Sequence, residues 1–113
     1  MQAKLEPIKS KGVETMHVVA DFSTILTISE MQRVVADKLA DIDIAMLFTN
    51  AGVVDVGSFA EMKDSSVQNM VAVNALHPLY LTKCLLPQML AREKRSALVV
   101  TSSAAATIPM PGG

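Results

Sequence analysis

The sequence predicts an α/β fold, a doubly wound parallel sheet in which three central strands alternate with two helices. Three apolar runs lead to this prediction, because their continuous rather than alternating character is typical of strands covered on both faces. Helical patterns separate the runs, and the order strand, helix, strand, helix, strand implies right-handed crossovers. A chain of 113 residues forms at most one domain.

The first strand and the first helix are predicted over residues 16–20 and 28–40. The strand has β-branched residues at its centre and ends at Asp21, where a loop opens. Thr27 and Glu30 have the spacing of a capping box, and apolar residues recur after them at helical intervals. These patterns place a helix directly after the loop.

The second and third strands, predicted over residues 42–48 and 97–100, flank a long helix predicted over residues 64–92. The helix follows from apolar residues at helical intervals, namely Val67, Met70, Val71, Leu81, Leu85, Leu86 and Leu90. Its basic end suits a helix C-terminus.

The composition limits the classes of function. Ten basic and eleven acidic residues give a net charge of −1 without a basic stripe, which gives no support for nucleic-acid binding. A single Cys84 and two scattered histidines build neither an internal disulfide nor a metal cluster. The apolar stretches are too short to span a membrane, and Met1 is not followed by the apolar segment of a secretory signal. We therefore expect no metal, no membrane segment and an intracellular, by default cytoplasmic, location.

Candidate site residues follow the second and third strands. Asn50, Ala51 and Gly52 come after the second strand, and Ser103 follows the third. The carboxyl ends of parallel strands meet at one edge of a sheet, where ligands bind. Gly52 lacks a Cβ and lets a cofactor approach the main chain closely, and the Ser103 hydroxyl can donate to a carbonyl or alcohol oxygen. Each of these segments, taken alone, also fits an ordinary turn at the end of a strand.

Asn74 stands out within the long predicted helix. Pro78, four residues later, has no N–H, so the carbonyl of Asn74 loses its usual helical partner and the helix is expected to kink. The free carbonyl can hold a water or a lysine in a proton relay, and the alternative is a proline kink satisfied by solvent. His77, next to the proline, is interpreted as a packed or partly exposed helix residue rather than a catalytic base.

In this order and spacing, Asp21, the stretch of Asn50 to Gly52, Asn74 and Ser103 resemble the central part of the short-chain dehydrogenase/reductase family. The resemblance implies that residues 1–113 form the central part of one NAD(P)-binding domain with a partial Rossmann-like fold. Asp21 corresponds to the acidic residue that contacts the adenine. Asn74 corresponds to the relay asparagine and Ser103 to the serine that orients the substrate, so these two are the implied catalytic residues. The implied cofactor-binding residues are Asp21, Phe22, Asn50, Ala51 and Gly52.

The resemblance further implies an NAD(P)-dependent oxidoreductase that acts on a carbonyl or alcohol group and forms homo-oligomers. Residues 19–23 and 108–111 also resemble the branch of 3-oxoacyl-CoA reductases and 17-beta-hydroxysteroid dehydrogenases. That branch implies fatty acyl-CoA or steroid substrates, favours NADP over NAD and is consistent with a parent protein at the endoplasmic reticulum. Thr49 departs from the family, which more often has a second asparagine there, and this should weaken a local hydrogen bond.

Two parts of the family pattern are expected outside this chain. The glycine-rich turn that holds the pyrophosphate has no counterpart before Lys4, and the catalytic tyrosine and lysine would follow Gly113. We therefore expect the chain alone to hold the cofactor weakly, to be inactive and to associate through its unpaired strand edges. The alternative is a non-catalytic Rossmann-fold binding or structural module, and a Tyr-x-x-x-Lys sequence beyond Gly113 would decide in favour of the enzyme.

Overall fold

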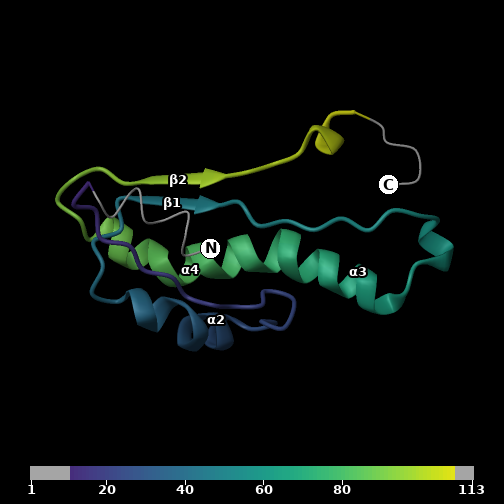
Figure 1. The fold of residues 1–113 in the computed structure, drawn as a ribbon, viewed down its shortest axis with the longest axis horizontal. Helices are drawn as coiled ribbons and strands as arrows, with labels where there is room; N and C mark the ends of the chain where they lie inside the picture. Colours follow the sequence, from purple (N-terminus) through teal and green to yellow (C-terminus); the bar gives the residue numbers. More distant parts are fainter. Residues whose placement is uncertain (1–10, 109–113) are drawn as a thin grey trace.

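A computed structural model describes residues 11–108 of the chain (Figure 1). Residues 1–10 and 109–113 lie outside the described part. Residues 1–10 are the segment for which the sequence predicts no secretory signal and no glycine-rich turn. Residues 109–113 include most of the stretch 108–111 on which the branch resemblance partly depends.

A parallel pair of strands confirms the predicted fold class. Strand β1 (Met46–Thr49) lies beside strand β2 (Ala97–Val100), with Met46 opposite Ala97 and Thr49 opposite Val100. Backbone hydrogen bonds continue past both ends of this ladder, from the Ala97 N–H to the Ala45 carbonyl at 2.9 Å and from the Thr101 N–H to the Thr49 carbonyl at 3.1 Å. The helices between the strands form the crossover that a parallel pair requires.

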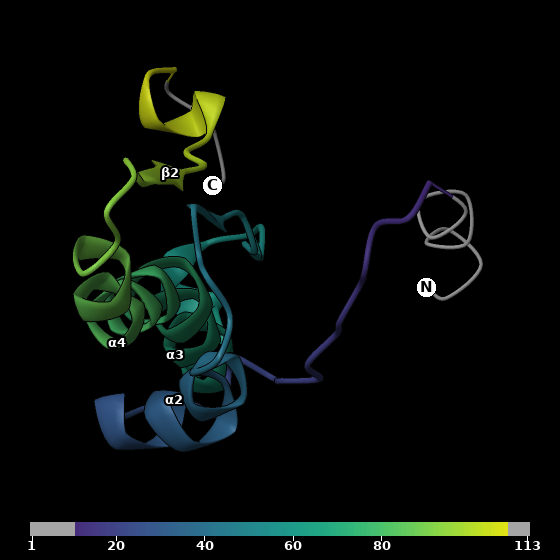
Figure 2. The ribbon, with the colours of Figure 1, turned by 90° about the vertical axis from the view of Figure 1, so that its left-hand side faces the viewer.

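The prediction of a third strand over residues 16–20 is wrong for the described structure. These residues have no strand assignment, and Val19 is 86 % exposed. A doubly wound sheet consists of two halves joined by a crossover. The strand just before that crossover lies at the outer edge of its half, away from the central strands. Residues 11–108 supply no strand for the positions between, so no ladder partner is present. Figure 2 shows the segment running away from β2 and the helices.

The first predicted helix is present in two pieces. Helix α2 (Ile28–Val34) is followed by a 3-10 turn (Ala36–Leu39), and Val35 between them has a backbone conformation outside the helical region. The capping box is confirmed, because the Glu30 N–H donates to Thr27 Oγ1 at 3.2 Å and the Thr27 N–H donates to Glu30 Oε2 at 3.0 Å. Each capped N–H is one that an isolated helix end would leave unpaired.

The second predicted helix is long and interrupted. It consists of α3 (Asp64–Val71), a π-helical turn (Ala72–Leu76) and α4 (His77–Leu90). The expected irregularity before Pro78 therefore takes the form of a π-helical turn. The expected apolar face is only partly correct, because Leu81 and Leu85 are buried whereas Val71 and Leu90 are exposed.

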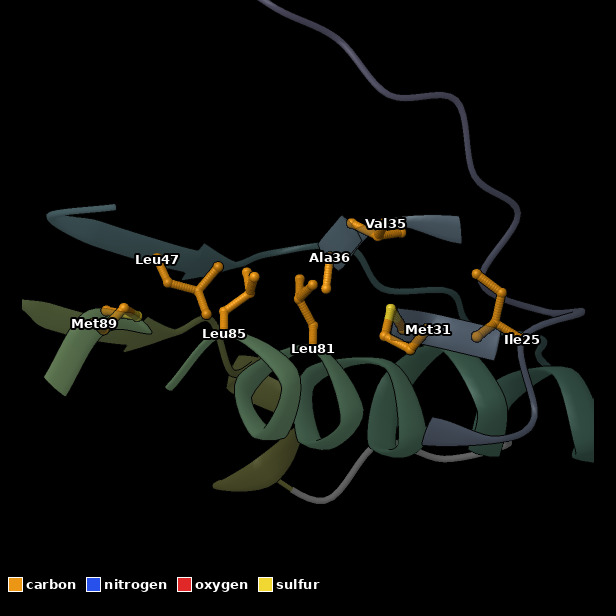
Figure 3. Close-up of a cluster of buried hydrophobic side chains, with 8 residues drawn as sticks. All are labelled: Ile25, Met31, Val35, Ala36, Leu47, Leu81, Leu85 and Met89. Carbon is orange, nitrogen blue, oxygen red and sulfur yellow. The ribbon is translucent and has the colours of Figure 1, made fainter. Parts of the chain in front are cut away.

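The core lies where α4 meets β1 on one side and α2 on the other (Figures 1 and 3). Its buried side chains come from these elements, the loop before α2 and the start of the 3-10 turn after α2: Ile25, Met31, Val35, Ala36, Leu47, Leu81, Leu85 and Met89. Met31 and Leu85 are the largest of the fully buried side chains.

One face of the sheet remains uncovered by the described residues. Leu47 and Thr49 are buried, whereas Met46 and Phe48, which point to the opposite face, are 56 % and 58 % exposed. The expectation that both faces are covered is therefore wrong for residues 11–108. The physical reason is that right-handed crossovers running in one direction across a sheet place their helices on the same face. No helix within residues 11–108 combines the length and the apolar character needed to cross a bilayer.

Candidate active site

The segments that follow β1 and β2 border one cleft. Its volume is about 590 Å³. The lining residues come from the two strand ends, the loop after β1 and the π-helical turn: Asn50, Ala51, Gly52, Val53, Val54, Asn74, Val100, Thr101, Ser102, Ser103 and Ala105. The cleft thus contains both predicted catalytic residues and three of the five predicted cofactor-binding residues. A larger hollow of about 840 Å³ beside α3 contains none of them.

Asn74 holds the loop after β1 with both ends of its side-chain amide. Its Oδ1 accepts the Val53 N–H at 2.9 Å, and its Nδ2 donates to the Val53 carbonyl at 2.8 Å. Gly52 lies so close that a Cβ placed there would be 3.4 Å from Asn74 Oδ1. The side chain is therefore occupied in fixing the cleft wall. Val53, the partner in this pair, is a residue that sequence reasoning missed, because a backbone acceptor and donor leave no side-chain pattern.

The main chain around Asn74 is irregular. The His77 N–H donates to the Ala72 carbonyl, a five-residue step that defines the π-helical turn. The α-helical partner of the Asn74 carbonyl would be the N–H of residue 78, which is a proline. The relay role of this carbonyl stays a prediction, while the side chain acts on Val53.

Ser103 lies at the N-terminus of a 3-10 turn (Ala104–Ala106). Its Oγ accepts the Ala105 N–H at 3.2 Å. A hydroxyl that already accepts a backbone N–H keeps its own hydrogen for donation. The 3-10 turn thus leaves Ser103 free to act as a donor in the cleft, which is the role predicted for it.

Thr49, the departure from the family pattern, is 3 % exposed at the end of β1. Its Oγ1 lies 3.5 Å from the Val99 carbonyl of the neighbouring strand, at the long limit of a hydrogen bond. The small hydroxyl therefore contacts β2 only weakly. That Thr49 weakens a local hydrogen bond relative to an asparagine stays a prediction.

The cleft wall fits a nicotinamide cofactor. Ala51 and Gly52 carry little or no side chain and Asn50 is exposed, so the main chain at the end of β1 is accessible. A Cβ at Gly52 would lie in van der Waals contact with Asn74 Oδ1, at 3.4 Å, so a side chain larger than alanine there would displace the amide that shapes this wall.

Asp21 and Phe22 do not line the cleft. The Asp21 carboxylate is exposed and accepts the backbone N–H of Ser23 at 2.9 Å and its hydroxyl at 2.7 Å. The Ser23 hydroxyl and backbone N–H hold the pKa of the Asp21 carboxyl below its usual range, so the group is an anion at neutral pH. The cofactor-binding roles of Asp21 and Phe22 remain predictions.

Phe22 packs against His77 instead of facing solvent. The two rings are stacked, with centroids 3.9 Å apart and planes inclined by 22°. His77 is 2 % exposed, which confirms that it is a packed helix residue. Burial lowers the pKa of the His77 imidazole, so the ring is neutral near pH 7. No sequence pattern indicates this pairing, because the partners lie 55 residues apart.

Comparison with known proteins gives a family match over the whole chain. Residues 1–113 match the sequence model of the family described as short chain dehydrogenase. A very-long-chain 3-oxoacyl-CoA reductase of Podospora anserina is 31 % identical over an alignment of 112 residues that covers 96 % of this chain and 32 % of that protein. The chain therefore spans about a third of the length of this curated relative.

Solved structures agree in fold. A metagenomic short-chain oxidoreductase in complex with NADP is 27 % identical with a TM-score of 0.82, and the match covers 99 % of this chain and 49 % of that one. A 7beta-hydroxysteroid dehydrogenase is 22 % identical with a TM-score of 0.79, covering 95 % of this chain and 40 % of that one. The second likeness supports the fold alone. From the family match and the parallel sheet together, the chain belongs to the short-chain dehydrogenase family and has part of its Rossmann-like fold.

Proposed function

We propose that this chain supplies the central part of an NAD(P)-dependent oxidoreductase site that acts on a carbonyl or alcohol group. The observation that carries the proposal is the single cleft shared by Ser103, Asn74 and the stretch Asn50 to Gly52. Ser103 accepts from Ala105 and can donate to a substrate oxygen. Pro78 removes the α-helical partner of the Asn74 carbonyl, which supports a place for that carbonyl in a proton relay.

The residues present would hold the cofactor along the end of β1. Asn50, Ala51 and Gly52 would contact it through the accessible main chain, and Asp21 would meet its adenine end. The bound nicotinamide supplies or accepts the hydride. Ser103 then holds the substrate oxygen in place by a hydrogen bond that strengthens as negative charge develops on that oxygen. The Asn74 carbonyl holds a water or a lysine, and this group replaces the proton that is given up to the substrate oxygen.

NADP is favoured over NAD, and a 3-oxoacyl-CoA is the first substrate to test. Support comes from the likeness to the Podospora anserina reductase and to the oxidoreductase solved with NADP. A steroid ketone is the second substrate, since the branch resemblance covers both.

The test is an NAD(P)H oxidation assay on the full-length protein that contains this segment, with 3-oxoacyl-CoA and steroid ketone substrates. Ser103→Ala should lower kcat about 100- to 1,000-fold, the usual effect of removing one donor to a developing oxyanion. Ser102→Ala is the matched control, because Ser102 also lines the cleft but has no assigned role. Cofactor binding without turnover on either class would refute catalysis and favour the non-catalytic binding module. Equal losses in the two serine variants would refute the role of Ser103.

A further inference from the structure

His77 closes the π-helical turn that contains Asn74. Its backbone N–H donates to the Ala72 carbonyl, and its Nδ1 lies 3.2 Å from the Val73 carbonyl. A carbonyl oxygen only accepts, so Nδ1 carries the hydrogen and the tautomer of the neutral ring is fixed. The buried, hydrogen-bonded imidazole is therefore held in one orientation, three residues from Asn74.

Phe22 stacks on the imidazole of His77 and belongs to a tight turn. The Thr24 N–H donates to the Asp21 carbonyl at 3.2 Å, and the Thr24 hydroxyl donates to the same oxygen at 2.9 Å. The Asp21 carboxylate binds Ser23 on the other side of the turn. With its internal geometry fixed in this way, the turn contacts the helix through the stacking of Phe22 on His77, beside the packing of Phe22 and Ile25 on the core.

We infer that His77 and Phe22 form a positioning pair that holds the Asp21 turn at a set distance from Asn74 and thereby determines the affinity for the cofactor. The inference rests on the proposed function, in which Asp21 meets the adenine end and Asn74 fixes the wall near the nicotinamide. Neither ring of the pair needs to touch the cofactor. Asn74 is held independently by Val53, so losing the pair should affect cofactor binding and leave the chemical step intact.

The experiment measures kcat and the cofactor KM for full-length protein carrying Phe22→Leu, His77→Leu, both changes, or His77→Phe. Each leucine variant should raise the cofactor KM roughly two- to tenfold, the range expected from the loss of one aromatic pair. The double variant should be no worse than either single variant, because both remove the same contact. His77→Phe keeps a flat ring for stacking and should restore the wild-type KM. The kcat should stay within about twofold of wild type.

A destabilised control separates positioning from general loss of structure. Leu85→Ala removes a side chain that is 2 % exposed in the core and does not line the cleft, so it should lower stability without raising the cofactor KM. An unchanged KM in the two leucine variants, additive effects in the double variant, or the same KM change in Leu85→Ala would each overturn the inference.

The outcome also distinguishes the inference from the proposed function. Turnover in the wild type with no KM change in the variants would refute the positioning pair alone. Cofactor binding without turnover, with a dissociation constant that the leucine variants raise, would refute the oxidoreductase activity and support the pair. Absence of both turnover and cofactor binding would overturn both proposals.

Discussion

Replacing Asn74 with alanine tests how the cleft wall is built. The change removes the two hydrogen bonds of 2.9 Å and 2.8 Å to Val53, and a typical hydrogen bond contributes about 1 kcal/mol. Both bonds are exposed to solvent, so water can replace part of the loss, and we expect a total of about 1–2 kcal/mol. The loss should be local, because Asn74 is the contact that fixes Val53 and neither residue belongs to the buried core cluster.

Amide hydrogen exchange is the assay that resolves this local loss. In Asn74→Ala, the Val53 N–H should exchange about 5- to 30-fold faster, the factor that corresponds to 1–2 kcal/mol. Core amides of α4 should change less. Asn69→Ala is a matched control, because the buried Oδ1 of Asn69 has no hydrogen-bond partner within residues 11–108 and its removal should cost little. Unchanged exchange at Val53 in Asn74→Ala would refute the reasoning.

Asn74→Asp adds a pH-dependent form of the same test. A carboxylate can accept the Val53 N–H but repels the Val53 carbonyl, to which Asn74 now donates. A protonated carboxyl regains a donor. Val53 should therefore exchange rapidly at neutral pH and regain protection once the new carboxyl is protonated, relative to Asn74→Ala at the same pH.

Three further predictions concern the wall, the core and the buried histidine. Gly52→Ala should keep the Val53 protection because its Cβ meets Asn74 at an ordinary 3.4 Å, whereas Gly52→Val should abolish it. Met31→Ala should lower the free energy of unfolding in urea by about 2–5 kcal/mol, since Met31 is fully buried. The folded-state pKa of His77 lies below its ordinary 6.5 because the ring is buried, so the unfolded state binds more protons. Stability should therefore be complete above about pH 6.5 and fall below it, and His77→Phe should remove this part of the pH dependence.

Local patterns predicted the elements that depend on near neighbours. The capping box of Thr27 and Glu30 joins residues three apart and is present with both hydrogen bonds. Strand pairing depends on partners far away in the sequence. Residues 16–20 have the composition of a strand, but without neighbours in the sheet they form no strand. Composition therefore identified a segment able to form a strand. It did not predict whether a neighbouring strand would be present to pair with it.

The gathering of site residues was predictable from topology. Asn50 and Ser103 follow parallel strands, so one crevice was expected to contain them both, and one cleft does. The partner of Asn74 was not predictable, because its side chain binds the backbone of Val53, 21 residues away. The residues that line the cleft are therefore predictable from the positions of the strand ends. The contacts that shape the cleft join residues far apart in the sequence and are not.

The row of buried residues on the long helix shows why its apolar face was only partly predicted. The buried positions on it follow a four-residue spacing through Val73, His77, Leu81, Leu85 and Met89, all 8 % exposed or less. With 3.6 residues per turn, each four-residue step rotates by about 40°, so this row winds around the helix. Its later members face the core, and His77 faces Phe22. Spacing thus accounts for the burial of His77. An aliphatic side chain would satisfy that spacing without a hydrogen-bond partner, so the stacked, hydrogen-bonded ring points to a role beyond core filling.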